Sequence, residues 1–162
     1  MLILCMLPAC CVGCSKKKPA VLNKEDVVIT SDEAMASDDF ICVCKIGDDE
    51  EFVIDSPRAK ELYNMVQSEP VKEKTPKDFT KMTLISLYFQ TGAAWDGGIL
   101  RPESQSTGEA YGLIGENAKW AGVYIITDKG SVCVSDTPVT DNAVWYVTED
   151  DFFDRVSDFI SK

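Results

Sequence analysis

The chain has 162 residues, with 27 acidic and 16 basic side chains, a formal net charge of -11 and no histidine. The lack of histidine excludes catalytic triads and zinc sites that depend on an imidazole, and the acidic balance argues against nucleic-acid binding, which needs Lys and Arg at the phosphates. Hydrophobic residues make up 45% of the chain, which is enough for one domain with its own core.

The start of the chain is an uncharged apolar run that ends at Cys14, where Ser15 and three lysines follow. This run is shorter than the ~20 apolar residues of a membrane-spanning helix, and its length suits the apolar part of an export signal. We therefore expect residues 1–13 to be a signal peptide, 14–26 a tether and 27–162 a single folded domain.

The segment before Cys14 resembles the lipobox of bacterial lipoproteins, in which small residues precede a cysteine, although Cys11 stands where that pattern has Leu or Val. The resemblance implies cleavage just before Cys14 and acylation of its sulfur with fatty acids such as palmitate. It also implies a lipid-anchored location on the extracytoplasmic face of the cell membrane. An uncleaved apolar anchor is the alternative, whereas a C-x-x-C zinc or redox site is disfavoured because no second such motif follows.

The first part of the domain is predicted to hold a β-hairpin. Residues 27–29 fit a short strand, and residues 31–39 are polar enough for a loop or one helical turn. Residues 40–46 and 51–54 are rich in β-branched and aromatic side chains, and the acidic residues 47–50 between them fit an exposed turn.

A helix over residues 57–68 follows, since Asp55 or Ser56 is placed to cap it and Pro57 fits its first turn. Its apolar side chains recur with helical spacing at Ala59, Leu62, Tyr63 and Val66.

Beyond this helix, residues 71–81 are typical of a surface connection. Residues 82–90 predict a central strand, because Ile85, Leu87 and Phe89 occupy one face and Leu84 and Tyr88 make the other partly apolar.

The last part of the chain predicts a hairpin and a terminal helix. Residues 120–127 and 131–135 flank Asp128-Lys129-Gly130, whose glycine suits a left-handed turn position. Residues 137–142 fit a turn and residues 143–147 a last strand. Thr148 and Asp151 then resemble a capping box for a helix over 149–160, whose buried stripe is Phe152, Val156, Phe159 and Ile160.

These elements predict an α+β fold in which a mainly antiparallel sheet carries two helices, near 57–68 and 149–160, packed on one face. Over about residues 40–162 the order of elements resembles that of small uncharacterised lipoproteins of Gram-positive bacteria. That resemblance implies no particular activity.

Three cysteines lie within the predicted domain. Cys42 and Cys44 point to the same face of one strand, and Cys133 lies far along the chain. Three interpretations stay open: buried small apolar residues, one disulfide to Cys133 if the strands are neighbours, or a soft-metal site for an ion such as Cu(I).

Residues 91–119 form a glycine-rich excursion with aromatic side chains at its borders, and loops of this kind often carry binding sites. The candidate ligand-binding residues are Trp95, Arg101, Tyr111 and Trp120. The alternative is that these rings pin a long loop to the sheet.

Runs of carboxylates at 38–39, 48–51 and 149–151 fit solvated turns and a helix start rather than an acid/base pair.

The predicted function is therefore that of a membrane-anchored, non-catalytic binding domain for an envelope protein or glycan. No catalytic residue, metal or cofactor is expected, and no nucleic-acid partner. Two other classes remain as alternatives: a carrier of a small ligand or metal, and a carboxylate-dependent envelope enzyme.

Overall fold

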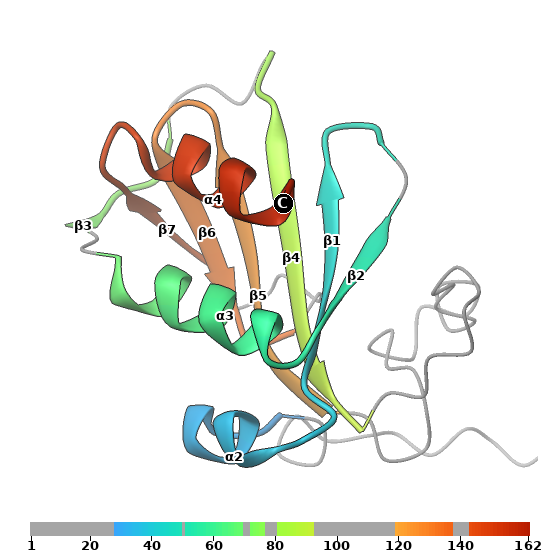
Figure 1. Ribbon diagram of the computed structural model, residues 1–162. Helices are drawn as coiled ribbons and strands as arrows, with labels where there is room; N and C mark the ends of the chain where they lie inside the picture. Colours follow the sequence, from blue (N-terminus) through green and yellow to red (C-terminus); the bar gives the residue numbers. More distant parts are fainter. Residues whose placement is uncertain (1–27, 50, 70–71, 77–80, 93–118, 138–142) are drawn as a thin grey trace, which may run out of the picture.

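The computed structural model describes residues 28–49, 51–69, 72–76, 81–92, 119–137 and 143–162. Its centre is a seven-stranded sheet in the order β2-β1-β4-β5-β6-β7-β3, in which every neighbouring pair is antiparallel (Figure 1). The strands are β1 (Ile41–Ile46), β2 (Phe52–Asp55), β3 (Lys72–Glu73), β4 (Leu84–Thr91), β5 (Lys119–Thr127), β6 (Ser131–Ser135) and β7 (Val144–Val147). The helices are α2 (Ser31–Ala36), α3 (Arg58–Ser68) and α4 (Phe152–Ile160).

The predicted fold class is confirmed. Helices α3 and α4 cover one face of the sheet, and α2 lies at the end of the sheet where β4 ends and β5 begins (Figure 1). Between the helices and the sheet lies the main core, in which Phe40, Tyr63, Phe89 and Tyr124 pack ring against ring, with centroids 4.9 to 6.4 Å apart. Four of these pairs are edge-to-face and Phe40 stacks on Phe89, and such pairs stabilise a core beyond the area they bury.

Both predicted hairpins are present. β1 pairs with β2, and β5 pairs with β6 across the turn 128–130. Gly130 has a φ of +70°, so the glycine occupies the left-handed position that the sequence predicted. The Thr127 hydroxyl oxygen accepts hydrogen bonds from the backbone N–H groups of Lys129 and Ser131, which closes the turn.

Helix α3 buries the four side chains that its spacing predicted, Ala59, Leu62, Tyr63 and Val66. The predicted cap is wrong, because Pro57 stands at the N-cap position and no side chain caps the helix. Asp55 instead ends strand β2, where it pairs with Ile41.

Helix α4 buries Phe152, Val156 and Ile160 as predicted, whereas Phe159 is only half-buried and lies under the guanidinium of Arg58, 5.4 Å from the ring centroid. The predicted capping box is wrong, because α4 begins after Asp151 without a side-chain cap. Thr148 belongs to the sheet end instead, where its N–H donates to the carbonyl oxygen of Gly130 at 3.0 Å.

Three other elements differ from the prediction. α2 is a six-residue helix with a complete capping box between Thr30 and Glu33, where a loop or a single turn was expected. Val28 makes one parallel bridge to Trp120 rather than a strand with Ile29. Lys72 and Glu73 form β3 and pair with β7 inside the expected surface connection, because Val147 and Tyr146 offer them backbone partners.

Candidate functional site

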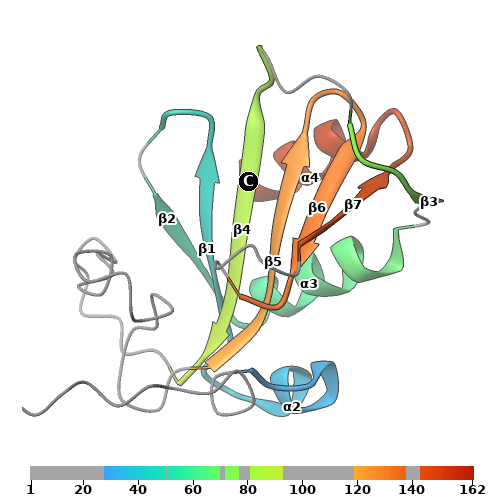
Figure 2. The same cartoon turned by 180° about the vertical axis from the view of Figure 1, so that it is seen from behind.

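The face of the sheet opposite α3 and α4 is covered by none of the described helices (Figure 2), and we call it the helix-free face. Strand register assigns side chains to it. Leu87 and Tyr124 pair across β4 and β5 within the main core, so their neighbours in each strand point the other way. One row of the helix-free face therefore runs across five strands through Lys45, Ser86, Ile125, Cys133 and Trp145.

The helix-free face is apolar over much of its area. Ile41 and Val43 form a second hydrophobic cluster with Val53 and Tyr88. Leu84 also lies on this face, because its neighbour Ile85 is buried in the main core. Leu84 is 37% exposed and is the large hydrophobic side chain most open to solvent within the described part of the chain. Ile41 and Val43 are themselves buried, at 8% and 5% exposure, so the apolar surface that a partner could contact here is that of Leu84 and the half-buried Tyr88.

The end of this face nearest α2 is built by Gln90 and Trp120, which pair across β4 and β5 just beyond an irregularity in their register. Both residues are 2% exposed. Trp120 lies 6.4 Å from the ring of Tyr88, and its carbonyl oxygen accepts from Ile29 at 2.9 Å. The Gln90 Oε1 atom is buried and has no hydrogen-bond partner in the described structure, which is costly for a buried acceptor.

The structure describes only one of the ligand-binding residues expected from the sequence. Trp95, Arg101 and Tyr111 lie outside the described residues, as does the expected lipidation site Cys14. Trp120 is placed in β5 and is buried, with its ring beside that of Tyr88 and its backbone bridged to Val28.

The sequence did contain a signal for this face. Alternation in residues 82–90 already placed Leu84 and Tyr88 opposite the buried side chains, and the structure confirms that placement. The role of Gln90 was missed, since one polar residue at a strand end carries no pattern of its own. Ile41 and Val43 were missed as a surface because β1 reads as apolar on both sides.

The sheet separates the three cysteines. Cys42 and Cys44 lie fully buried in the main core with their sulfur atoms 3.6 Å apart. Cys133 pairs with Ile125 and Trp145 on the helix-free face. The disulfide to Cys133 and the three-cysteine metal site are therefore wrong, and all three thiols are free. Burial raises the pKa of the Cys42 thiol well above its ordinary value, and burial also raises the pKa of Cys133, so both stay protonated.

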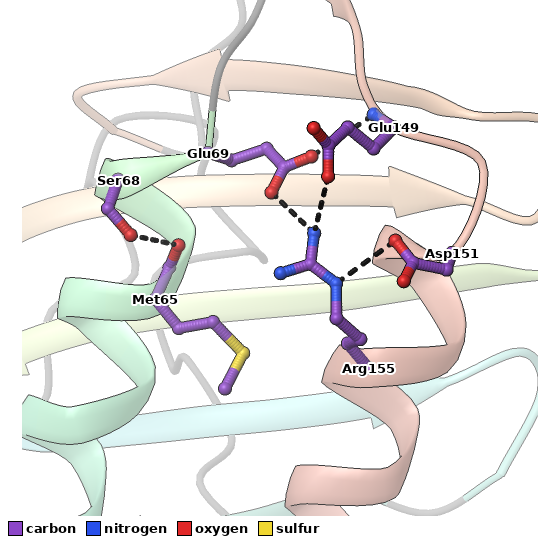
Figure 3. Close-up of polar contacts among 6 residues, drawn as sticks. All are labelled: Met65, Ser68, Glu69, Glu149, Asp151 and Arg155. Carbon is purple, nitrogen blue, oxygen red and sulfur yellow. Dashed lines mark hydrogen bonds and ion pairs between the residues drawn. The ribbon is translucent and has the colours of Figure 1, made fainter.

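The most extensive group of charged side chains joins α3 to α4 (Figure 3). Arg155 donates to the carboxylate of Glu69 at 2.7 Å and to Asp151 at 3.1 Å, and it lies 3.7 Å from Glu149. The other oxygen of Glu69 accepts the backbone N–H of Glu149 at 3.1 Å. Every carboxylate here is engaged by the arginine, so the group ties helices together rather than forming an acid/base pair. The sequence analysis attributed the carboxylates at 149–151 to a helix start and did not predict their contacts with Arg155.

No group of three or more Cys, Asp or Glu side chains within the described ranges has the arrangement of a metal site. Among the same residues, no helix is both long enough and apolar enough to cross a membrane.

No protein-family model, curated protein or solved structure matches the chain significantly.

Proposed function

We propose that the chain is a membrane-anchored, extracytoplasmic lipoprotein whose folded part is a non-catalytic binding domain for a protein or another component of the cell envelope. The observation that carries this proposal is the helix-free face. Its apolar side chains include Leu84, which is 37% exposed, and the rings of Tyr88 and Trp145, which are half-buried. Aromatic and aliphatic side chains of this kind supply most of the binding energy in protein interfaces.

The charged groups support binding rather than catalysis. Glu69 and Asp151 are held by Arg155, and the neighbouring free thiols of Cys42 and Cys44 are fully buried. General acid or base chemistry requires a group that can exchange a proton with a substrate. These groups instead stabilise the fold.

The anchor is supported by the sequence around Cys14 and by the position where the described domain begins. Val28 bridges to Trp120 beside the end of the helix-free face. Residues 14–27 would therefore join the domain at the α2 end of the sheet. Several acyl chains on one cysteine hold a protein at a membrane almost permanently, because each buried CH₂ contributes ~0.8 kcal/mol.

The proposal is tested by capturing partners from native membranes with the acylated protein. Leu84→Glu places a carboxylate on the helix-free face, and Asn64→Glu places one on the exposed side of α3 as a matched control. We expect capture to be lost with Leu84→Glu and kept with Asn64→Glu. Equal capture by both variants would show that the binding surface lies elsewhere.

A further inference from the structure

We propose that the outer edge of β2 binds an extended basic segment of another protein, which adds a further strand to the sheet. β2 is the last strand at one side of the sheet, and β1 is the strand that pairs with it in the described part of the chain (Figures 1 and 2). An edge strand offers a row of backbone donors and acceptors to another chain, and addition of a strand to such an edge is a common mode of peptide recognition. Leu84 lies on β4, two strands away, so this site goes beyond the proposed function.

Two hydrogen bonds at the end of β1 show which way its backbone groups point. Gly47, which follows β1, donates its N–H to the carbonyl oxygen of Leu84 in β4 at 2.7 Å. The carbonyl oxygen of Ile46 accepts the N–H of Asp49, in the turn between β1 and β2, at 3.0 Å. Ile46 therefore turns its backbone groups toward β2. Because successive residues of an antiparallel strand bond to opposite sides, every second residue back along β1 does the same.

The same alternation sets the direction of the β2 backbone. Cys44 is the next residue of β1 that bonds toward β2, and it pairs with Phe52. Cys42, two residues earlier, pairs with Ile54. Phe52 and Ile54 thus use their backbone groups toward β1. Val53, between them, directs its N–H and its carbonyl oxygen away from the sheet, where a further strand can bond to both.

The side chains of this edge are available for contact. Val53 packs in the second hydrophobic cluster, on the helix-free side, so Glu51 and Asp55 project to that side as well. Phe52 and Ile54 contribute to the main core on the other side. Both carboxylates are exposed, and Phe52 and Val53 are half-buried. The edge therefore presents two charges on either side of an apolar residue.

These charges favour a basic partner. Residues 41–55 contain five carboxylates and one cation, Lys45, which lies in β1 on the inner side of β2. Arg58, which follows the strand, donates to the backbone of α4 instead. Opposite charges that face each other across two strands are attractive, so an added strand should carry Lys or Arg opposite Glu51 and opposite Asp55. The partner segment therefore has basic residues four positions apart.

A second copy of β2 does not fit this edge. In two-fold antiparallel pairing, the register that uses the whole strand is centred on Val53. It places Glu51 of each copy opposite Asp55 of the other, twice in the pair. Like charges directly opposite each other destabilise a sheet, so the charges that attract a basic segment exclude the chain's own edge.

A synthetic probe tests the site on the full chain in detergent. The probe is the end-capped peptide Lys-Val-Thr-Val-Lys, aligned antiparallel like every pair in the sheet, so that its Thr lies opposite Val53. Titration followed by NMR should shift the backbone signals of residues 51–55 and leave that of Asn64, on the exposed side of α3, unchanged. The peptide Glu-Val-Thr-Val-Glu should not bind. No binding of the lysine peptide, or equal binding of both peptides, overturns the proposal.

Methylation of single amides in the peptide distinguishes strand addition from attraction between charges alone. In antiparallel pairing the Thr amide faces Val53, whereas the amides of the two peptide Val residues point away from β2. N-methylation at Thr should weaken binding about fivefold through loss of a hydrogen bond, and N-methylation at either Val should not. Equal losses at the two kinds of position contradict pairing with β2.

A pair of double variants tests the two charges. Glu51→Gln with Asp55→Asn keeps the size of both side chains and should weaken binding of the lysine peptide about fivefold. Asp128→Asn with Asp150→Asn, at exposed positions outside the β1–β2 hairpin, changes the net charge equally and should leave binding unchanged. Equal weakening would show that the peptide responds to net charge, and the site would be wrong. If the lysine peptide does not bind while capture still depends on Leu84, this site is wrong and the proposed function stands.

Discussion

The guanidinium of Arg155 lies 2.7 Å from the carboxylate of Glu69, whose side chain is 2% exposed, and thereby links the residue that follows α3 to the first turn of α4 across 86 residues of sequence (Figure 3). The arginine also stacks over the ring of Phe152, 5.5 Å from its centroid. The two helices that cover the main core are thus joined at one charged contact.

Arg155→Met removes the charged partner of Glu69 and leaves a buried carboxylate with one backbone N–H donor. We expect a loss of about 1–3 kcal/mol in the free energy of unfolding, because Arg155 is partly exposed and water screens part of the interaction. Chemical denaturation measures this loss. Lys129→Met, in the exposed β5–β6 turn, is the control and should change stability by less than about 0.5 kcal/mol. Equal effects would mean that the contact does not stabilise the fold.

The stability lost when a side chain of α4 is truncated to alanine should depend on which side of the helix carries it. Phe152 is fully buried, so Phe152→Ala is expected to cost ~3–5 kcal/mol. Phe159 is half-buried, so Phe159→Ala should cost clearly less and should also release Arg58. Thermal unfolding of the two variants gives the order. A larger cost at Phe159 would contradict the observed packing of α4.

The stability of the fold should fall at alkaline pH. Burial raises the pKa of Tyr124 to about 12 and also raises the pKa of Tyr63. Since the unfolded phenol titrates near ~10, the folded state holds the proton more tightly, and this stabilisation is complete below pH ~10 and lost as the pH rises toward about 12. Denaturation from pH 9 to 12 should show this decline, and Tyr124→Phe should make it shallower. A decline of equal steepness in the variant would exclude Tyr124 as its source.

Acylation at Cys14 is tested by radiolabelled palmitate. Label should enter the wild type and not Cys14→Ser, and the variant should accumulate as an uncleaved precursor, because the acylated sulfur directs cleavage. Cys5→Ser, in the apolar run away from the lipobox, is the control and should be labelled like the wild type. Labelling of the Cys14→Ser variant to the same extent as the wild type would contradict a lipid anchor at Cys14.

Much of the fold was predictable where a pattern repeats. The helical spacing of Leu62, Tyr63 and Val66 and the alternation of Ile85 with Leu87 each follow from burial of one face. Element ends were less predictable. The sequence from Thr148 to Asp151 is typical of a helix cap, but the backbone N–H of Thr148 donates to the carbonyl oxygen of Gly130 and so continues the pairing of β7 with β6.

Contacts distant in sequence were not predictable. Glu69 and Arg155 meet only because α3 and α4 lie side by side on the sheet. Lys72 and Glu73 become a strand only because β7 offers a partner, and two exposed charged residues show no β pattern of their own. Cys133 lies on the other face of the sheet from Cys42. This placement depends on the strand order, which local sequence patterns do not contain.

The central claim, a binding surface on the extracytoplasmic side of the membrane, is tested most directly by labelling intact cells or spheroplasts with a membrane-impermeant maleimide. Asn64→Cys should label rapidly, which places the domain outside the membrane. Leu84→Cys should label severalfold more slowly in cells than in dilute purified protein, because its partner covers the helix-free face. Equal rates for Leu84→Cys in the two settings would contradict the account.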